Sequence, residues 1–207
     1  MALVKYNNNS ISAVTSASSI PSGALTHIKT LTASSSATLS FVDGSDGVVL
    51  DSTYPIYKFE FINIHPSATS TFQFNMSIDG GSTYAVTKTT TAFRAFHTES
   101  DSGSGLGYVA GIDLAQSTAF QDLATDSSGT DNDSGISGTL QLFNPSSTTY
   151  VKHFMSNTNS VKTDSEAKNI YIAGYGNTTS SIDAVRFQMS SGNIDAGTIK
   201  LYGIKDS

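Results

Sequence analysis

Acidic and amide side chains gather in one stretch of the sequence, Asp126-Ser-Ser-Gly-Thr-Asp-Asn-Asp-Ser-Gly135. Calcium is bound by six to eight oxygen ligands, and alternating Asp and Asn residues near a glycine can supply them. The spacing of Asp131 and Asp133 matches part of such a loop, but the next acidic residue is Asp164. Asp131 and Asp133 are therefore weak candidates for a metal site, with a solvated turn as the alternative, and we expect no cofactor.

The chain contains four histidines, His27, His65, His97 and His153. No two of them have the short spacing of a metal-ligand pair on one element. His97 and His153 fall within predicted strands, so the fold could bring them together. A paired or hydrogen-bonded histidine on a strand is the preferred interpretation for each. The histidines alone therefore indicate no metal site.

The chain lacks the sequence patterns that are typical of catalysis by a nucleophile or by paired carboxyl groups. The chain has 34 serines, none of them in a Gly-x-Ser-x-Gly elbow. Glycoside hydrolysis needs two acidic side chains about 5–10 Å apart across a cleft. Glu60 and Glu99 lie on different predicted strands and are the candidates for such a pair. We expect a protein that is not an enzyme, and a polysaccharide-degrading enzyme is the alternative that requires this pair.

Tyrosine side chains could stack on a sugar ring. The candidates are Tyr108, Tyr150, Tyr171, Tyr175 and Tyr202. Aromatic residues that alternate along strands more often belong to the core. Tyr108 lies between two irregular stretches, Ser100–Gly107 and Asp113–Ser137, and long loops are usually functional or mobile. If the chain binds a host glycan, we expect these loops and Tyr108 to line a shallow site.

Charge and composition exclude several classes of protein. The net charge is −6, and the 11 Lys and Arg residues are scattered singly. No basic cluster is available to bind nucleic acid. No run approaches the ~18 apolar residues that a membrane-spanning helix needs, and the chain starts without an apolar signal segment. Because cysteine is absent, there is no disulfide framework. We expect neither nucleic-acid binding nor membrane insertion.

The elements that would position these residues are short strands. The sequence has 34 Ser and 25 Thr but only 3 Glu, a composition that disfavours helices. Period-two alternation begins after Ser36 and is clearest from Thr71 to Ile78. About ten short strands, separated by Gly, Ser, Asn and Asp, predict an all-β fold. The expected architecture is an antiparallel β-sandwich, jelly-roll-like, with an extended N-terminal arm.

Local signals refine this pattern. The predicted strands are Ala37–Val42, Tyr57–Ile64, Thr71–Ile78, Tyr84–Thr89, Ala92–Thr98, Thr139–Phe143, Thr149–Met155, Asn169–Tyr175, Ala184–Met189 and Thr198–Ile204. The phase of alternation slips by one between Phe61 and Ile62, which either a β-bulge or a strand end buried on both faces would explain. Asp79-Gly-Gly-Ser82 predicts a hairpin turn, because glycine accepts positive φ. Asp113–Gln116 predicts one short helical turn.

The beginning of the chain differs from the rest. It is small, polar and weakly periodic, and Ile11 and Val14 are its first bulky aliphatic residues after Tyr6. Such a segment cannot bury enough surface to fold alone, but it could order against a neighbour. We divide the chain into an extended docking arm and linker, residues 1–33, and a β-sandwich domain, residues 34–207.

Four strings of residues resemble a known group of proteins. They are Lys5–Ser16, Leu142–Phe154, Ala173–Tyr175 and Ser190–Gly203. Together they resemble small virion structural proteins of tailed bacteriophages, marine ones especially, and the resemblance covers nearly the whole chain. The matching motifs are structural, so no active site is carried over.

The resemblance implies a non-enzymatic protein on a phage particle, in a tail, a fibre or a head decoration. It implies a β-sandwich that assembles with itself, preferably as a homotrimer, and with other virion proteins. We expect Tyr6, Ile11 and Val14 to belong to an arm that docks on the virion by adding a strand to a neighbouring sheet. The alternative is a tail adhesin that binds a glycan of the host cell surface.

Overall fold

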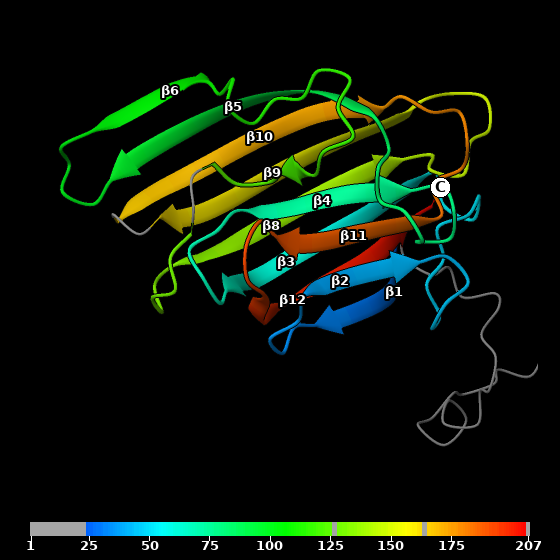
Figure 1. Cartoon of the computed structure of the whole chain (residues 1–207), viewed down its shortest axis with the longest axis horizontal. Coiled ribbons are helices and arrows are strands. Elements are labelled where there is room, and N and C mark those ends of the chain that lie inside the picture. Colours follow the sequence, from blue (N-terminus) through cyan, green and yellow to red (C-terminus); the bar gives the residue numbers. More distant parts are fainter. Residues whose placement is uncertain (1–23, 126–127, 163–164, 206–207) are drawn as a thin grey trace, which may run out of the picture.

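The computed structural model describes residues 24–125, 128–162 and 165–205. Its strands are β1 (Leu25–Thr32), β2 (Thr38–Val42), β3 (Ile56–Pro66), β4 (Phe72–Ser77), β5 (Lys88–Thr98), β6 (Ser104–Tyr108), β7 (Gln121–Asp122), β8 (Gly135–Phe143), β9 (Lys152–Lys162), β10 (Glu166–Gly176), β11 (Ala184–Met189) and β12 (Ile194–Ile204). They form two antiparallel sheets that pack face to face (Figure 1). The predicted all-β sandwich is confirmed, and the described residues contain no helix.

The winding of the chain is that of a jelly roll. The large sheet has the order β1-β12-β3-β8-β9-β10-β5-β6, and the small sheet has the order β2-β11-β4-β7. Strands pair from the two ends of the chain inwards: β1 with β12, β2 with β11, β3 with β8 and β4 with β7. Successive strands of this set lie in different sheets, except β4 and β7, which are neighbours in the small sheet, as in an eight-stranded jelly roll. The jelly-roll expectation is therefore confirmed.

Two further hairpins widen the large sheet. β9 and β10 pair with each other beside β8, and β5 with its partner β6 pairs with the far side of β10. Figure 1 shows these strands extending past the small sheet, with β6 at the upper edge. The large sheet therefore presents a broad face that the small sheet does not cover.

A cluster of phenylalanine rings fills the space between the sheets. Phe187 on β11 packs against rings of both layers, with centroids 5.2 Å from Phe59 and from Phe61 on β3 and 5.8 Å from Phe72 on β4. These four side chains are at most 2% exposed. Edge-to-face and offset contacts of this kind contribute beyond the area that they bury. The cluster fixes the two sheets relative to each other.

The predicted phase slip is a β-bulge. The pairing of β3 with β8 shifts register between Phe61 and Ile64, and Asn63 has a φ of 49°. The extra residue lets Ile64 return to the core, where it is fully buried. Of the two explanations left open by the sequence, the structure selects the bulge.

Several predicted boundaries were wrong. The segment Leu25–Thr32 is β1, paired with β12, so the sheet begins inside the segment 1–33 assigned to the arm and linker. Its weak alternation reflects a register shift between His27 and Lys29. The two predicted strands Tyr84–Thr89 and Ala92–Thr98 are replaced in the structure by the single strand β5, Lys88–Thr98. Residues 113–116 form no helical turn.

The turn after β4 is present but does not make a hairpin. Gly80 and Gly81 have φ values of 69° and 79°, as the sequence predicted. The chain then crosses to the large sheet, where β5 pairs with β10 and β6 instead of with β4. The docking-arm residues Tyr6, Ile11 and Val14 lie outside the described residues.

Candidate functional site

The face of the large sheet that points away from the small sheet is here called the outer face. On β5, β9 and β10 buried and accessible residues alternate, which gives each strand one side toward the core and one side outward. Phe93, Met155 and Tyr171 lie on the outward side and are 44%, 56% and 41% exposed. Apolar side chains on a solvent-accessible sheet face point to a surface with a function.

Three aromatic residues on this face form a cluster across β10, β5 and β6. Phe93 lies opposite Tyr171 in one pairing and opposite Tyr108 in the other. The rings of Phe93 and Tyr171 stack with centroids 4.9 Å apart and an interplanar angle of 9°. The Tyr108 hydroxyl donates a hydrogen bond to Asp113 Oδ2 at 2.5 Å, and this bond raises the pKa of Tyr108. Phe93, Tyr108 and Tyr171 together are called the aromatic cluster.

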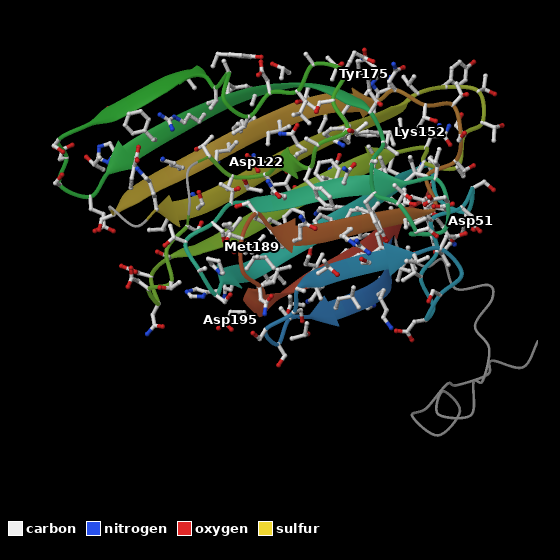
Figure 2. The ribbon with its side chains drawn as sticks, in the orientation of Figure 1. Asp51, Asp122, Lys152, Tyr175, Met189 and Asp195 are labelled. Carbon is white, nitrogen blue, oxygen red and sulfur yellow. The ribbon has the colours of Figure 1, made fainter. Side chains whose placement is uncertain are left out.

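A shallow hollow lies beside the aromatic cluster on the same face. Its volume is about 470 Å³, and it is lined by Thr89, Thr90, Thr91, Phe143, His153, Phe154, Met155, Ala173, Gly174 and Tyr175. Ala173 lies between Tyr171 and Tyr175 along the outward side of β10 and opposite Met155 on β9, and its small side chain leaves the outer surface lower there. The rings of His153 and Tyr175 are 6.3 Å apart. Figure 2 labels Tyr175 near one end of β10. No Asp, Glu, Lys or Arg residue lines the hollow.

A polar groove lies toward the opposite end of the large sheet. It has a volume of about 560 Å³ and is lined by Asn63, His65, Asn132, Asp133, Ser134, Gly135, Ser137, Asn159, Val161, Asp195 and Ala196. Figure 2 places Asp195 at this end, far from Tyr175. The groove brings Asp133 and Asp195 into one wall, although they are distant in sequence. Its amide and carboxylate groups suit hydrogen bonding to hydroxyl groups.

The predicted calcium loop is not assembled in the described part of the chain. Asp133 faces the groove, whereas the backbone carbonyl of Asp131 contacts His65 Nε2 at 2.9 Å. No group of three or more His, Asp or Glu residues that could hold a metal ion occurs among the described residues. Asp131 and Asp133 therefore belong to no such group in the described part of the chain.

The carboxyl groups of Glu60 and Glu99, which the alternative of a polysaccharide-degrading enzyme would require, do not meet. Glu60 forms an ion pair with Lys58 at 2.8 Å on β3, whereas Glu99 follows β5. Four strand spacings separate β3 from β5 in the large sheet, or about 19 Å at ~4.8 Å each. Glu60 and Glu99 therefore cannot act on one glycosidic bond, which needs carboxyl groups about 5–10 Å apart.

The strand histidines are also separated. His97 lies opposite Ala167 on β10, and His153 lies opposite Tyr175 on the same strand. His97 Nε2 instead contacts Asp101 at 3.1 Å. The interpretation of His97 as a hydrogen-bonded strand histidine is confirmed, and a meeting of His97 with His153 is excluded.

The two stretches that flank Tyr108 are only partly loops. Ser104–Tyr108 is strand β6, so Tyr108 projects from a strand, where it is 59% exposed. The following stretch turns inward, because Leu123 and Ala124 are fully buried. The Thr158 hydroxyl on β9 donates a hydrogen bond to the carbonyl of Leu123. The stretch thus contacts the aromatic cluster at Asp113, which accepts the hydrogen bond of Tyr108, whereas its residues Leu123 and Ala124 belong to the core.

Three lysines lie on the inner side of the large sheet, where the sequence pattern did not lead us to expect them. Lys88, Lys152 and Lys168 are at most 1% exposed. Lys88 Nζ donates to Asn75 Oδ1 at 2.6 Å and to the carbonyl of Val86 at 2.8 Å. Burial lowers the pKa of Lys88 to about 7, because the charged amine loses its hydration.

The other two buried lysines have different partners. Lys152 Nζ donates to the carbonyl of Tyr150 at 2.6 Å, and burial lowers its pKa. Lys168 Nζ lies 3.2 Å from Glu166 Oε2 in a buried ion pair. A signal was present in the sequence, because each lysine is in phase with a core residue of its own strand: Lys88 with Ala92, Lys152 with Phe154 and Lys168 with Ile170.

Comparison with known proteins adds no relative. No protein-family model, curated protein or solved structure matches this chain. In the described part of the chain, no helix has the length and apolar character needed to cross a membrane. Its class is therefore defined by the fold, an antiparallel jelly-roll sandwich with an extended outer face.

Proposed function

We propose that this chain is a non-enzymatic structural protein of a bacteriophage particle, displayed as an oligomeric appendage of a tail, a fibre or the head. The observation that carries the proposal is the outer face, where Phe93, Tyr108, Tyr171, Met155 and Leu106 are exposed together. Extended apolar patches are uncommon on a protein that works as a monomer. A neighbouring copy or another virion protein would cover this patch.

Further features support a structural role. Antiparallel strands bonded edge to edge give a stiff unit, and the chain contains no cysteine, so no disulfide holds its core. Two of the strings that resemble phage virion proteins, Leu142–Phe154 and Ala173–Tyr175, meet at the hollow. In this proposal residues 1–23 dock the protein on the particle, the sandwich faces outward, and assembly as a homotrimer follows from the resemblance.

The proposal is tested by the absolute mass of the purified protein. Light scattering is applied to the full chain and to a chain that starts at Ala24, because a later start at Leu31 would remove most of β1. If both chains form a trimer, the interface lies in the sandwich and the arm remains available for docking. A trimer that is lost on truncation makes the arm the assembly element. A monomer in both contradicts the oligomeric appendage.

The second candidate function is binding of a host-cell glycan. The hollow favours it, because the Tyr175 and Phe143 rings can pack on the apolar face of a sugar while His153 and Thr91 supply hydrogen-bonding groups at its rim. A glycan array is screened with the wild type, with Tyr175→Ala and with Tyr150→Ala. Tyr150 is 70% exposed and lies outside the hollow. A signal lost only in Tyr175→Ala supports this function, and an array without signals contradicts it.

A further inference from the structure

Strand β6 is an unprotected edge of the large sheet. Its sequence, Ser104-Gly-Leu-Gly-Tyr108, contains no charged residue and no proline, and its pairing with β5 has no register shift. Leu106 is 77% exposed, more than any other large apolar side chain in the described part of the chain. Edge strands of soluble monomers normally carry charges, proline or bulges, because an open edge pairs with other chains.

The opposite edge of the same sheet is protected. β1 has a register shift between His27 and Lys29, and the Lys29 side chain forms an ion pair with Asp46. The part of β5 that β6 does not reach is covered as well, because Lys88 and Thr90 bond the backbone of Ser117 and Leu114. Protection is thus missing at β6 in particular.

The pairing of β6 with β5 shows which backbone N–H and C=O groups of β6 have no partner in β5. Thr98 N–H donates to the carbonyl of Gly103, and Val109 N–H donates to the carbonyl of Ala92. In an antiparallel pair the residues that bond a given neighbour alternate. Gly105 therefore points its backbone groups at β5, as Gly103 and Val109 do. The N–H and C=O groups of Ser104, Leu106 and Tyr108 point away from β5, toward the open edge.

The glycine at position 105 of β6 fits this arrangement. A Cβ atom on Gly105 would lie 2.8 Å from the Phe96 ring, so that ring occupies the inner side of β6. The face on which Leu106 and Tyr108 project is the outer face, next to Phe93 and Ala95 of β5. An added strand would therefore extend the aromatic cluster without displacing any side chain of β6.

We propose that β6 is a self-association edge that pairs, antiparallel and about a two-fold axis at Leu106, with β6 of a second copy of this chain. With Leu106 on the axis, Ser104 of each copy faces Tyr108 of the other, and all three residues on each copy have the backbone groups free for bonding. Because β6 has no charged residue, no like charges face each other across this contact. Two large sheets become one continuous sheet, and each Leu106 packs on its counterpart. This inference does not depend on the location of the protein on a particle.

The absence of native cysteine makes a crosslinking test specific. In Leu106→Cys the two introduced thiols would sit on facing residues, where Cα atoms of a hydrogen-bonded pair are about 5.5 Å apart. That separation lies within the range for a disulfide. Tyr150→Cys is the matched control, since Tyr150 is 70% exposed on the loop between β8 and β9. We expect mild oxidation to crosslink most of Leu106→Cys and little of the control.

Light scattering on Leu106→Lys and Tyr150→Lys gives the second arm of the test. The wild type and Tyr150→Lys are expected to form a dimer, or a hexamer if a three-fold contact is also present. Leu106→Lys is expected to have half that mass, since two ammonium groups would meet on the axis. Circular dichroism confirms that each variant keeps its strands.

Three results would overturn the proposal. The first is a wild-type monomer, or an isolated trimer, at about 100 µM. The second is a yield of crosslinked Leu106→Cys no higher than that of Tyr150→Cys. The third is an assembly that disappears when the chain starts at Ala24 while Leu106→Cys remains uncrosslinked, because the occupant of the contact would then be the N-terminal segment.

Discussion

Replacing Lys88 by methionine is expected to raise the free energy of unfolding at neutral pH, and the gain should shrink as the pH rises. Lys88 is fully buried on the inner side of β5, where Asn75 Oδ1 and the carbonyl of Val86 accept its hydrogen bonds. Neither acceptor carries a charge. Burial lowers the pKa of Lys88 from 10.5 to about 7, so protonation of the folded protein is penalised.

The size and sign of the change in the free energy of unfolding follow from the pKa shift of Lys88. One pKa unit corresponds to about 1.4 kcal/mol, so the shift sets an upper limit of about 5 kcal/mol on the destabilisation by the buried charge. Between pH 7 and pH 10.5 the unfolded chain binds the Lys88 proton more strongly than the folded chain does. Stability therefore rises with pH across this window. Below pH 7 both states are protonated at Lys88 and the full penalty is present.

The variant removes this pH dependence. Methionine has a similar length and no charge, but it leaves the Val86 carbonyl without the Lys88 donor, at a cost of about 1–3 kcal/mol. Asn75 Oδ1 keeps a hydrogen bond from the N–H of Met76 at 2.9 Å. At pH 7 we expect Lys88→Met to be more stable than the wild type by about 2–3 kcal/mol. Between pH 7 and pH 9 this advantage should fall by about 2 kcal/mol.

Urea unfolding, followed by circular dichroism at pH 6, 7, 8 and 9, measures the difference. The control is Lys205→Met, because Lys205 is exposed after the end of β12 and should show no pH-dependent difference. A difference between Lys88→Met and the wild type that is the same at pH 7 and at pH 9 would refute the reasoning. It would mean that the amine is hydrated or paired in the folded protein.

Three other changes test separate features of the fold. Phe187→Ala should lower the free energy of unfolding by about 3–5 kcal/mol, measured in urea, because it empties the centre of the aromatic core. Gly197→Ala should be destabilising and Gly107→Ala nearly neutral by the same measurement: Gly197 has a φ of 114° and a Cβ there would lie 2.5 Å from a backbone oxygen, whereas no atom lies within 4 Å at Gly107. Asp79 accepts a hydrogen bond from Thr83 N–H at 2.8 Å, which lowers the pKa of Asp79. The wild type should therefore lose stability relative to Asp79→Asn as the pH falls below about 4 in an acid-unfolding series.

Much of the sheet structure could be predicted because alternation is a local property. The spacing of Phe72, Phe74 and Met76 places all three side chains on one side of a strand, and the structure buries them fully. The same rule applied to Lys88, Lys152 and Lys168 would have placed them inward. They were overlooked because lysine is rarely buried fully, so its type argued against its position.

Residues of the candidate site could not be brought together from the sequence. Phe93 and Tyr171 are adjacent only because β5, which is sequentially remote from β10, pairs with it. Tyr108 could not be placed correctly either, since a stretch rich in glycine and serine predicts a loop. The ladder with β5 makes it a strand, and the Phe96 ring covers Gly105.

The sequence by itself determined the class of fold, because period-two alternation and the shortage of helix-forming residues leave few alternatives to an antiparallel sandwich. It also determined the turn at Gly80 and Gly81, where only local backbone geometry matters. The tertiary structure alone decided which strands lie side by side, and hence the outer face, the hollow and the open edge at β6. The physical reason is that strand pairing joins residues far apart in the chain, and the energies that select one pairing belong to the whole sheet and not to any short segment.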